Sequence, residues 1–134
     1  MKTYTKLIVR PYELDSYNHV NNAVYQNYLE HARMDMLRQL GFKYNDFYNA
    51  GYFIYVTHVD IFYKASAVLN DELTIECEMT KVGFISGTIH QKILNQNGTL
   101  IVEADVDWAC VKASNHRPCK IPSEFMIPEL EPKK

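Results

Sequence analysis

The sequence predicts a single α+β domain in which one long helix packs against a five-stranded antiparallel sheet. A helical apolar stripe occurs within residues 21–40, and segments of strand character flank it, one before and four after. A helix with a single apolar face must bury that face, and alternating strands offer a matching apolar surface. The chain has 134 residues, of which 47% are hydrophobic, and this suits one domain with one core.

The first two elements are a strand and a loop. Residues 4–10 have the composition of a strand, and residues 11–18 contain Pro, Asp, Ser and Asn, which favour turns. The loop therefore leads directly into the predicted helix.

The helix is predicted over about residues 21–40. Its apolar side chains recur at steps of three or four and are Tyr25, Leu29, Ala32, Met36 and Leu40. Asn21 or Asn22 suits the N-cap, because an Asn side chain can accept a hydrogen bond from an unpaired backbone amide. Gly41 suits the position just after the helix.

The remaining segments are predicted as a short helix at 43–50 and four strands. The strands comprise residues 52–64, 71–81, 84–94 and 99–112, which are rich in β-branched and aromatic residues or alternate apolar with polar ones. The domain is expected to cover residues 1–134. Residues 126–134 are expected to be a loose tail, because Pro128 and Pro132 interrupt regular structure and the last two residues are charged. A small sheet with open edges also favours dimer formation.

Composition excludes several classes of function. With 14 basic and 16 acidic side chains, the net charge of -2 provides no broad basic surface for nucleic acid. No apolar run is long enough to span a bilayer, and the N-terminus lacks the apolar stretch of a signal peptide. The cysteines, which are Cys77, Cys110 and Cys119, have no metal-ligand spacing. We therefore expect a cytoplasmic protein without a metal.

The most informative segment is the loop before the helix, where Asp15 precedes the predicted helix start. The first amides of a helix are unpaired and carry partial positive charge, so they can stabilise a carbonyl oxygen that gains negative charge. A nearby carboxylate can attack that carbonyl or activate water. An Asp in such a loop is more often only a turn former, so both interpretations of Asp15 stay open. His19 is either a partner of Asp15 or a loop residue.

A family resemblance supports the catalytic interpretation. The stretch from Asp15 to Tyr25 reads DSYNHVNNAVY and continues through Tyr28, Glu30, Ala32 and Arg33. It resembles the signature of the hotdog-fold acyl-CoA thioesterases, in the 4-hydroxybenzoyl-CoA thioesterase-like group that includes YbgC-type enzymes. The similarity extends through Phe62-Tyr63, Asn70-Asp71-Glu72-Leu73, Arg117-Pro118 and Ile121-Pro122. The resemblance implies a hotdog fold, in which the sheet wraps one long central helix.

The resemblance also implies a reaction and a site. Asp15 is expected to be the nucleophile or general base on an acyl-CoA thioester, and the Asn22 amide is expected to polarise the thioester carbonyl. The candidate substrate-binding residues are His19, Asn21, Tyr25, Lys64, Arg117 and Lys120. No cofactor is expected, since coenzyme A is part of the substrate. Two subunits of the family pair through their sheets around the acyl pocket, so we expect a homodimer or homotetramer.

Several positions depart from the family pattern, and other functions remain alternatives. Asn18 replaces the usual Gly before His, and Asn tolerates a left-handed turn. YbgC-type sequences often have His at the position of Asn22 and Tyr at that of Pro11. The alternatives are an acyl-ACP thioesterase and a hotdog protein that only binds acyl thioesters, although the presence of Asp15 argues against a pure binder.

Overall fold

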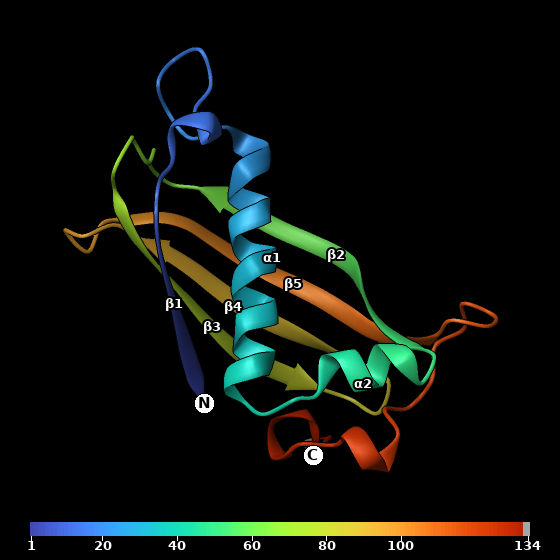
Figure 1. The fold of residues 1–134 in the computed structure, drawn as a ribbon. Helices are drawn as coiled ribbons and strands as arrows, with labels where there is room; N and C mark the ends of the chain where they lie inside the picture. The colour runs from blue at the N-terminus through green and yellow to red at the C-terminus, as the bar shows by residue number, and fades with distance from the viewer. Residues whose placement is uncertain (133–134) are drawn as a thin grey trace.

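The structure is a computed structural model that describes residues 1–132. It contains one five-stranded antiparallel sheet in the order β1-β3-β4-β5-β2, with a long helix across one face (Figure 1). The elements are β1 (Lys2–Ile8), η1 (Pro11–Glu13), α1 (Asn22–Gln39), α2 (Tyr44–Asn49), β2 (Tyr52–Tyr63), β3 (Glu72–Val82), β4 (Ser86–Leu94), β5 (Leu100–Lys112), η2 (Ser123–Phe125) and η3 (Pro128–Leu130). The predicted fold class and element order are confirmed.

The ends of the predicted elements differ slightly from those observed. β1 begins at Lys2 and ends at Ile8, and the next amide, of Val9, continues its pairing with the chain before β3 by donating to the Asp71 carbonyl at 3.0 Å. The short 3-10 helix η1 was not predicted, and it has Pro11 at its first position, where a missing amide costs little. Gly41 follows α1 with a φ of 83°, as expected for a glycine at this position.

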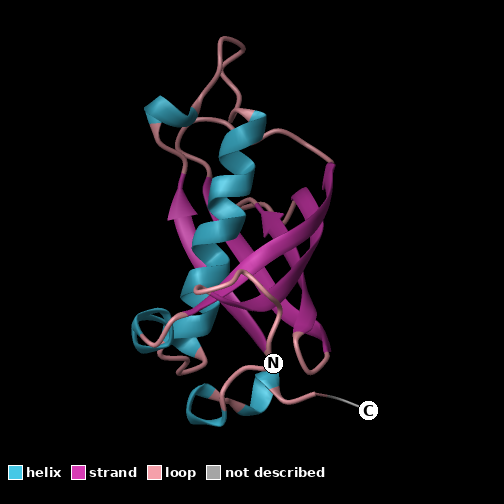
Figure 2. Cartoon of the chain, turned by 90° about the vertical axis from the view of Figure 1, so that its right-hand side faces the viewer, coloured by secondary structure: helices cyan, strands magenta, loops and turns pink. Residues whose placement is uncertain are grey.

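The core lies between α1 and the inner face of the sheet, which curves around the helix (Figure 2). The buried side chains of α1 are Tyr25, Tyr28, Leu29, Ala32, Met36 and Leu37. On β3, Leu73, Ile75, Cys77 and Met79 are buried, as the alternation of that segment predicted. A helical stripe with a period near 3.6 residues and a strand with a period of 2 therefore meet in one core.

The C-terminal segment packs more closely than the sequence suggested. Pro128 begins η3 instead of breaking the structure, and Leu130 is only 3% exposed. The neighbouring Phe125 ring meets the buried Phe47 ring edge-on, with 5.4 Å between centroids. Of the predicted loose tail, residues 126–132 are thus partly anchored to the core, whereas 133–134 lie outside the described residues.

The sheet has two edges, β1 and β2, and β2 is the longer. Several large side chains of β2 are exposed, among them Tyr55, Val56, Phe62 and Tyr63. A long apolar edge strand offers unpaired backbone groups to another chain. None of the described helices combines the length and hydropathy needed to cross a membrane.

Candidate active site

The loop that carries Asp15 is closed by its own backbone. The Asp15 amide donates to the His19 carbonyl at 2.8 Å, and the Asn18 amide donates to the Asp15 carbonyl at 3.1 Å. Leu14 and Val20 form an antiparallel bridge at its base. Asn18 has a φ of 61°, so it adopts the left-handed turn that the family places at Gly. The substitution of Asn for Gly therefore preserves the bend.

The Asp15 side chain has a structural contact and a free oxygen. Its Oδ1 accepts the Tyr17 amide at 2.9 Å, which is the pattern of an Asx turn. Within the described chain no donor contacts Oδ2, and the residue is only half-buried. Burial raises the pKa of Tyr25, and the Asp15 charge adds to that rise, so the carboxylate lies near the first turn of α1. The turn-forming and catalytic interpretations of Asp15 are compatible with each other.

The start of α1 leaves one amide unoccupied. Asn21 is the N-cap, and its Oδ1 accepts the Ala23 amide at 2.9 Å. The Val24 amide donates to the Asn21 carbonyl at 2.9 Å. The Asn22 amide has no acceptor among the described residues, and it stands at the positive end of an 18-residue helix. The cap thus occupies the neighbouring donors and leaves the Asn22 amide without an acceptor in the described part of the chain.

Other predicted residues occur at this same end of the molecule. His19 and Asn21 are exposed, and Lys64 follows Tyr63, the last residue of β2, whose hydroxyl donates to the Asn22 carbonyl at 3.4 Å. Tyr25 is instead a core residue, because it is 3% exposed and its hydroxyl accepts the Ala67 amide at 2.9 Å.

Arg117 and Lys120 lie elsewhere in the chain. The Lys112 amide donates to the Arg117 carbonyl at 3.0 Å, and Lys112 pairs with Tyr52, the first residue of β2. The 12 residues of β2 separate this end from Lys64, a span of roughly 35 Å for an extended strand. Within one chain, therefore, Arg117 and Lys120 are not part of the site at Asp15.

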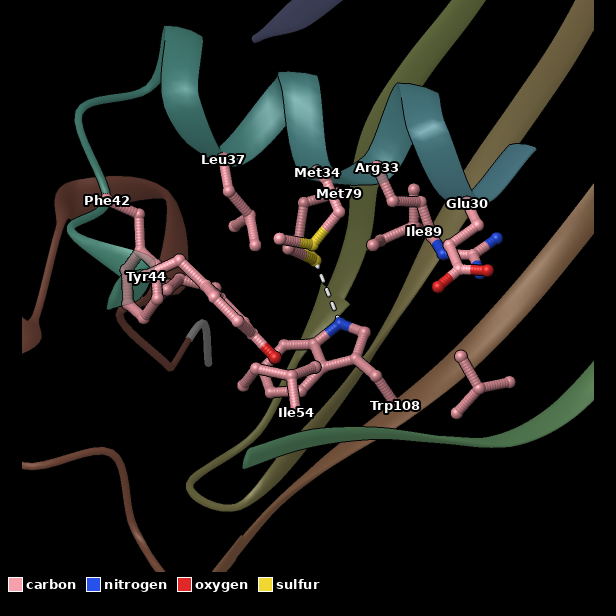
Figure 3. Close-up of a pocket in the computed structure, with 12 residues that line it drawn as sticks. Glu30, Arg33, Met34, Leu37, Phe42, Tyr44, Ile54, Met79, Ile89 and Trp108 are labelled. Carbon is pink, nitrogen blue, oxygen red and sulfur yellow. Dashed lines mark hydrogen bonds between the residues drawn. The ribbon is translucent and has the colours of Figure 1, made fainter. Parts of the chain in front are cut away.

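A small apolar cavity lies between the C-terminal half of α1 and the sheet (Figure 3). It measures about 120 Å³ and is lined by Glu30, Arg33, Met34, Leu37, Phe42, Tyr44, Ile54, Val56, Met79, Ile89, Trp108 and Leu130. The indole N–H of Trp108 donates to the Met79 sulfur at 3.2 Å, and this hydrogen bond orients the ring that forms one wall of the cavity. Counted along α1 from Asn22, the lining begins at Glu30, about 12 Å away, and ends at Leu37, about 22 Å away.

Sequence reasoning missed two features of this region, the cavity and the buried carboxylate of Glu13, which is 6% exposed. A glutamate in a polar loop is normally exposed, so the composition did not predict that Glu13 is buried. The spacing of Arg10, Pro11 and Glu13 could have indicated this burial, because it fits a capped 3-10 turn in which Arg10 and Glu13 form an ion pair. In the described part of the chain, His, Cys, Asp and Glu side chains form no group of three or more placed for a metal ion.

Comparison with known proteins adds to this geometry. The sequence profile of the thioesterase-like superfamily matches residues 9–128. The chain is 33% identical over 123 residues to the long-chain acyl-CoA thioesterase FadM of Escherichia coli K12, covering 90% of this chain and 92% of that one. It is 31% identical over 107 residues to the acyl-CoA thioester hydrolase YbgC of Escherichia coli O157:H7, covering 80% of each chain. In fold it is similar to a DHNA-CoA thioesterase from Staphylococcus aureus, with a TM-score of 0.85, 24% identity and coverage of 89% and 80%.

Proposed function

The chain belongs to the thioesterase-like superfamily, and from this premise we propose that it hydrolyses acyl-CoA to a free acid and coenzyme A. The observation that carries the proposal is that a half-buried Asp15 stands in the loop leading into α1 and that the Asn22 amide at the start of this helix has no acceptor among the described residues. FadM and YbgC, whose names state this activity, support it across most of the chain. A carboxylate can act as nucleophile or base in acyl transfer, and a positive helix end can stabilise the oxyanion that forms.

The residues divide the reaction between them. The Asn22 amide donates a hydrogen bond to the thioester oxygen and stabilises the negative charge that develops there. Asp15 either attacks the carbonyl carbon to form a mixed anhydride, which water then cleaves, or removes a proton from the attacking water. In both routes the carbon–sulfur bond breaks and the thiolate of coenzyme A leaves. Water supplies the hydroxyl group of the free acid, and its remaining proton goes to the solvent or to the leaving thiolate.

The cavity along α1 supports a long acyl chain as the substrate. An extended chain advances about 1.2 Å per bond, so a carbonyl at Asn22 would place the tenth or later bond at the level of the lining residues. The walls there are largely apolar and include Leu37, Ile89 and Trp108. FadM, a relative over nearly the full chain, is named for long-chain acyl-CoA. We therefore assign long-chain acyl-CoA as the preferred substrate class.

The exposed edge of β2 supports a homodimer with a composite site. If two copies pair antiparallel along β2, the Tyr52 end of one strand meets the Tyr63 end of the other. Arg117 and Lys120 of one subunit would then approach Asp15 and Lys64 of the other. This arrangement would bring the predicted coenzyme A contacts of one subunit close to the Asp15 loop of the other.

Light scattering at micromolar concentration tests the proposed homodimer. A particle of twice the chain mass is expected, and a monomer contradicts the proposal.

The cytoplasm is the proposed location. Cys77, Cys110 and Cys119 are all free thiols in the structure. The Sγ atoms of Cys110 and Cys119 are 3.6 Å apart and unbonded, which suits a reducing compartment.

A thiol-release assay over straight-chain acyl-CoA substrates of increasing length tests the function. We expect turnover that rises with chain length until the cavity is filled. The same assay with matched acyl-ACP thioesters distinguishes the carrier. Binding of acyl-CoA without any release of thiol would show a pure binding protein and overturn the proposal.

A further inference from the structure

Glu13 is a buried carboxylate with an unusually complete set of donors. Its Oε1 accepts the Arg10 amide at 2.8 Å and the Tyr28 hydroxyl at 2.8 Å. Its Oε2 accepts the Arg10 guanidinium, from Nη2 at 2.6 Å and Nε at 3.0 Å. Four hydrogen bonds from two residues satisfy this carboxylate, and the one from Tyr28 ties the chain before the loop to the second turn of α1.

The backbone of Glu13 makes a second connection. Its carbonyl accepts the Asn21 amide at 3.0 Å, so the residue before the loop is joined directly to the N-cap of α1. Glu13 thus holds both ends of the segment 14–20, which carries Asp15. The tip of that segment is exposed and is closed by its own backbone bonds and by the Asp15 side chain, which accepts the Tyr17 amide. The Val20 amide, which donates to the Ala67 carbonyl at 3.0 Å, is a further attachment to the body of the domain.

The charge of Glu13 is maintained by its partners. Burial by itself would raise the pKa of this carboxyl, but the hydrogen bonds from Arg10 and Tyr28 together outweigh burial and lower it. The pKa of Tyr28 is raised by burial and by the bond to Glu13, so its hydroxyl remains a donor. The anchor is consequently an ionised acceptor at neutral pH, with all its donors in place.

We infer that Glu13 is a positioning residue for the proposed reaction, because it anchors the Asp15 loop to α1 and so fixes the Asp15 carboxylate relative to the helix-start amide. The inference rests on the proposed function for its kinetic consequence, and on the structure alone for the anchoring. Glu13 is buried, with 6% of its surface exposed, and both of its carboxylate oxygens are occupied by Arg10 and Tyr28. Its effect is therefore on the geometry of Asp15, where displacement of about 1 Å is enough to slow a reaction markedly.

The test compares Glu13→Gln and Tyr28→Phe with the parent. Each variant keeps the shape of the side chain and weakens the anchor, and Tyr28→Phe is the milder because it removes one hydrogen bond. Amide hydrogen exchange at residues 15–21 should accelerate in both, by about tenfold or more in Glu13→Gln, because local opening becomes easier. With long-chain acyl-CoA, kcat should fall about tenfold or more while KM changes little, since the cavity is untouched.

Glu76→Gln is the matched control, because Glu76 pairs with Lys2 at 2.8 Å on the sheet, away from the loop. It should leave exchange at residues 15–21 and kcat as in the parent. The inference is overturned if loop exchange in the Glu13 and Tyr28 variants matches the control. It is also overturned if exchange accelerates and kcat per folded molecule does not fall. Should the parent release no thiol, the proposed function fails, and exchange still decides whether Glu13 anchors the loop.

Discussion

The two ends of α1 differ in the kind of group that would contact the same substrate. At the N-terminal end the important groups are a backbone amide, at Asn22, and a carboxylate on a loop held by hydrogen bonds. In the C-terminal half the important groups are side chains, such as Leu37, that line an apolar cavity with Trp108. The first end depends on where the backbone lies, and the second depends on the size of its side chains. Substitutions at the two ends should therefore change different properties of the enzyme, namely the overall rate at the first end and the preference for chain length at the second.

The largest effect that separates the ends is expected from Asn22→Pro. Proline removes the amide that we assign to the thioester oxygen, and loss of one such donor costs about a hundredfold or more in kcat. The fold should tolerate the change, because Asn22 is the first residue of α1 and Asn21 has φ -62° and ψ 140°, which suit a residue before proline.

Asn22→Ala keeps the amide and is the control, with activity close to that of the parent. Thiol release and thermal melting of the three proteins provide the comparison at every chain length. Equal activity of Asn22→Pro and Asn22→Ala would exclude the amide from the reaction.

A smaller and selective effect is expected from Leu37→Trp at the other end. The larger side chain fills part of the cavity, so kcat/KM should fall about tenfold for long acyl chains and hardly change for short ones. The same substitution at Leu40, which does not line the cavity, should leave the length preference unaltered. A uniform loss of activity across chain lengths would show that the cavity does not hold the acyl chain.

The smallest effect concerns stability and pH. The pKa of Glu13 is lowered from its ordinary value of 4.5 in the folded protein, so its ionisation stabilises the fold above that value. The stabilisation is lost as pH falls through the folded-state pKa. The melting temperature of the parent should exceed that of Glu13→Gln near pH 7, and the difference should shrink below about pH 4. A difference that grows on acidification would contradict the lowered pKa.

Local patterns predicted most of the fold. The apolar stripe of residues 21–40 and the alternation in 71–81 are complete within each segment, and both were confirmed. The left-handed turn at Asn18 was also expected, since it depends on one residue. The anchored Leu130 was not foreseen, because its burial depends on packing against a distant part of the chain.

The candidate site was only partly foreseeable. Asp15 and Asn22 are close in sequence, so their common location at the start of α1 followed from the motif. Glu13 and Tyr28 meet only after α1 packs, and no local pattern identified their hydrogen bond. Arg117 was selected as a basic residue within the family resemblance, and neither ground could show that the residue lies at the far end of β2.

The most direct test of the account is Asp15→Asn, measured by thiol release from a long-chain acyl-CoA and by thermal melting. The amide keeps the oxygen that accepts the Tyr17 amide, so the loop should survive and the melting temperature should change little. It cannot act as a nucleophile or base, so the rate should fall by about a hundredfold or more. A variant that hydrolyses acyl-CoA as fast as the parent but melts much earlier would show that Asp15 is only a turn former.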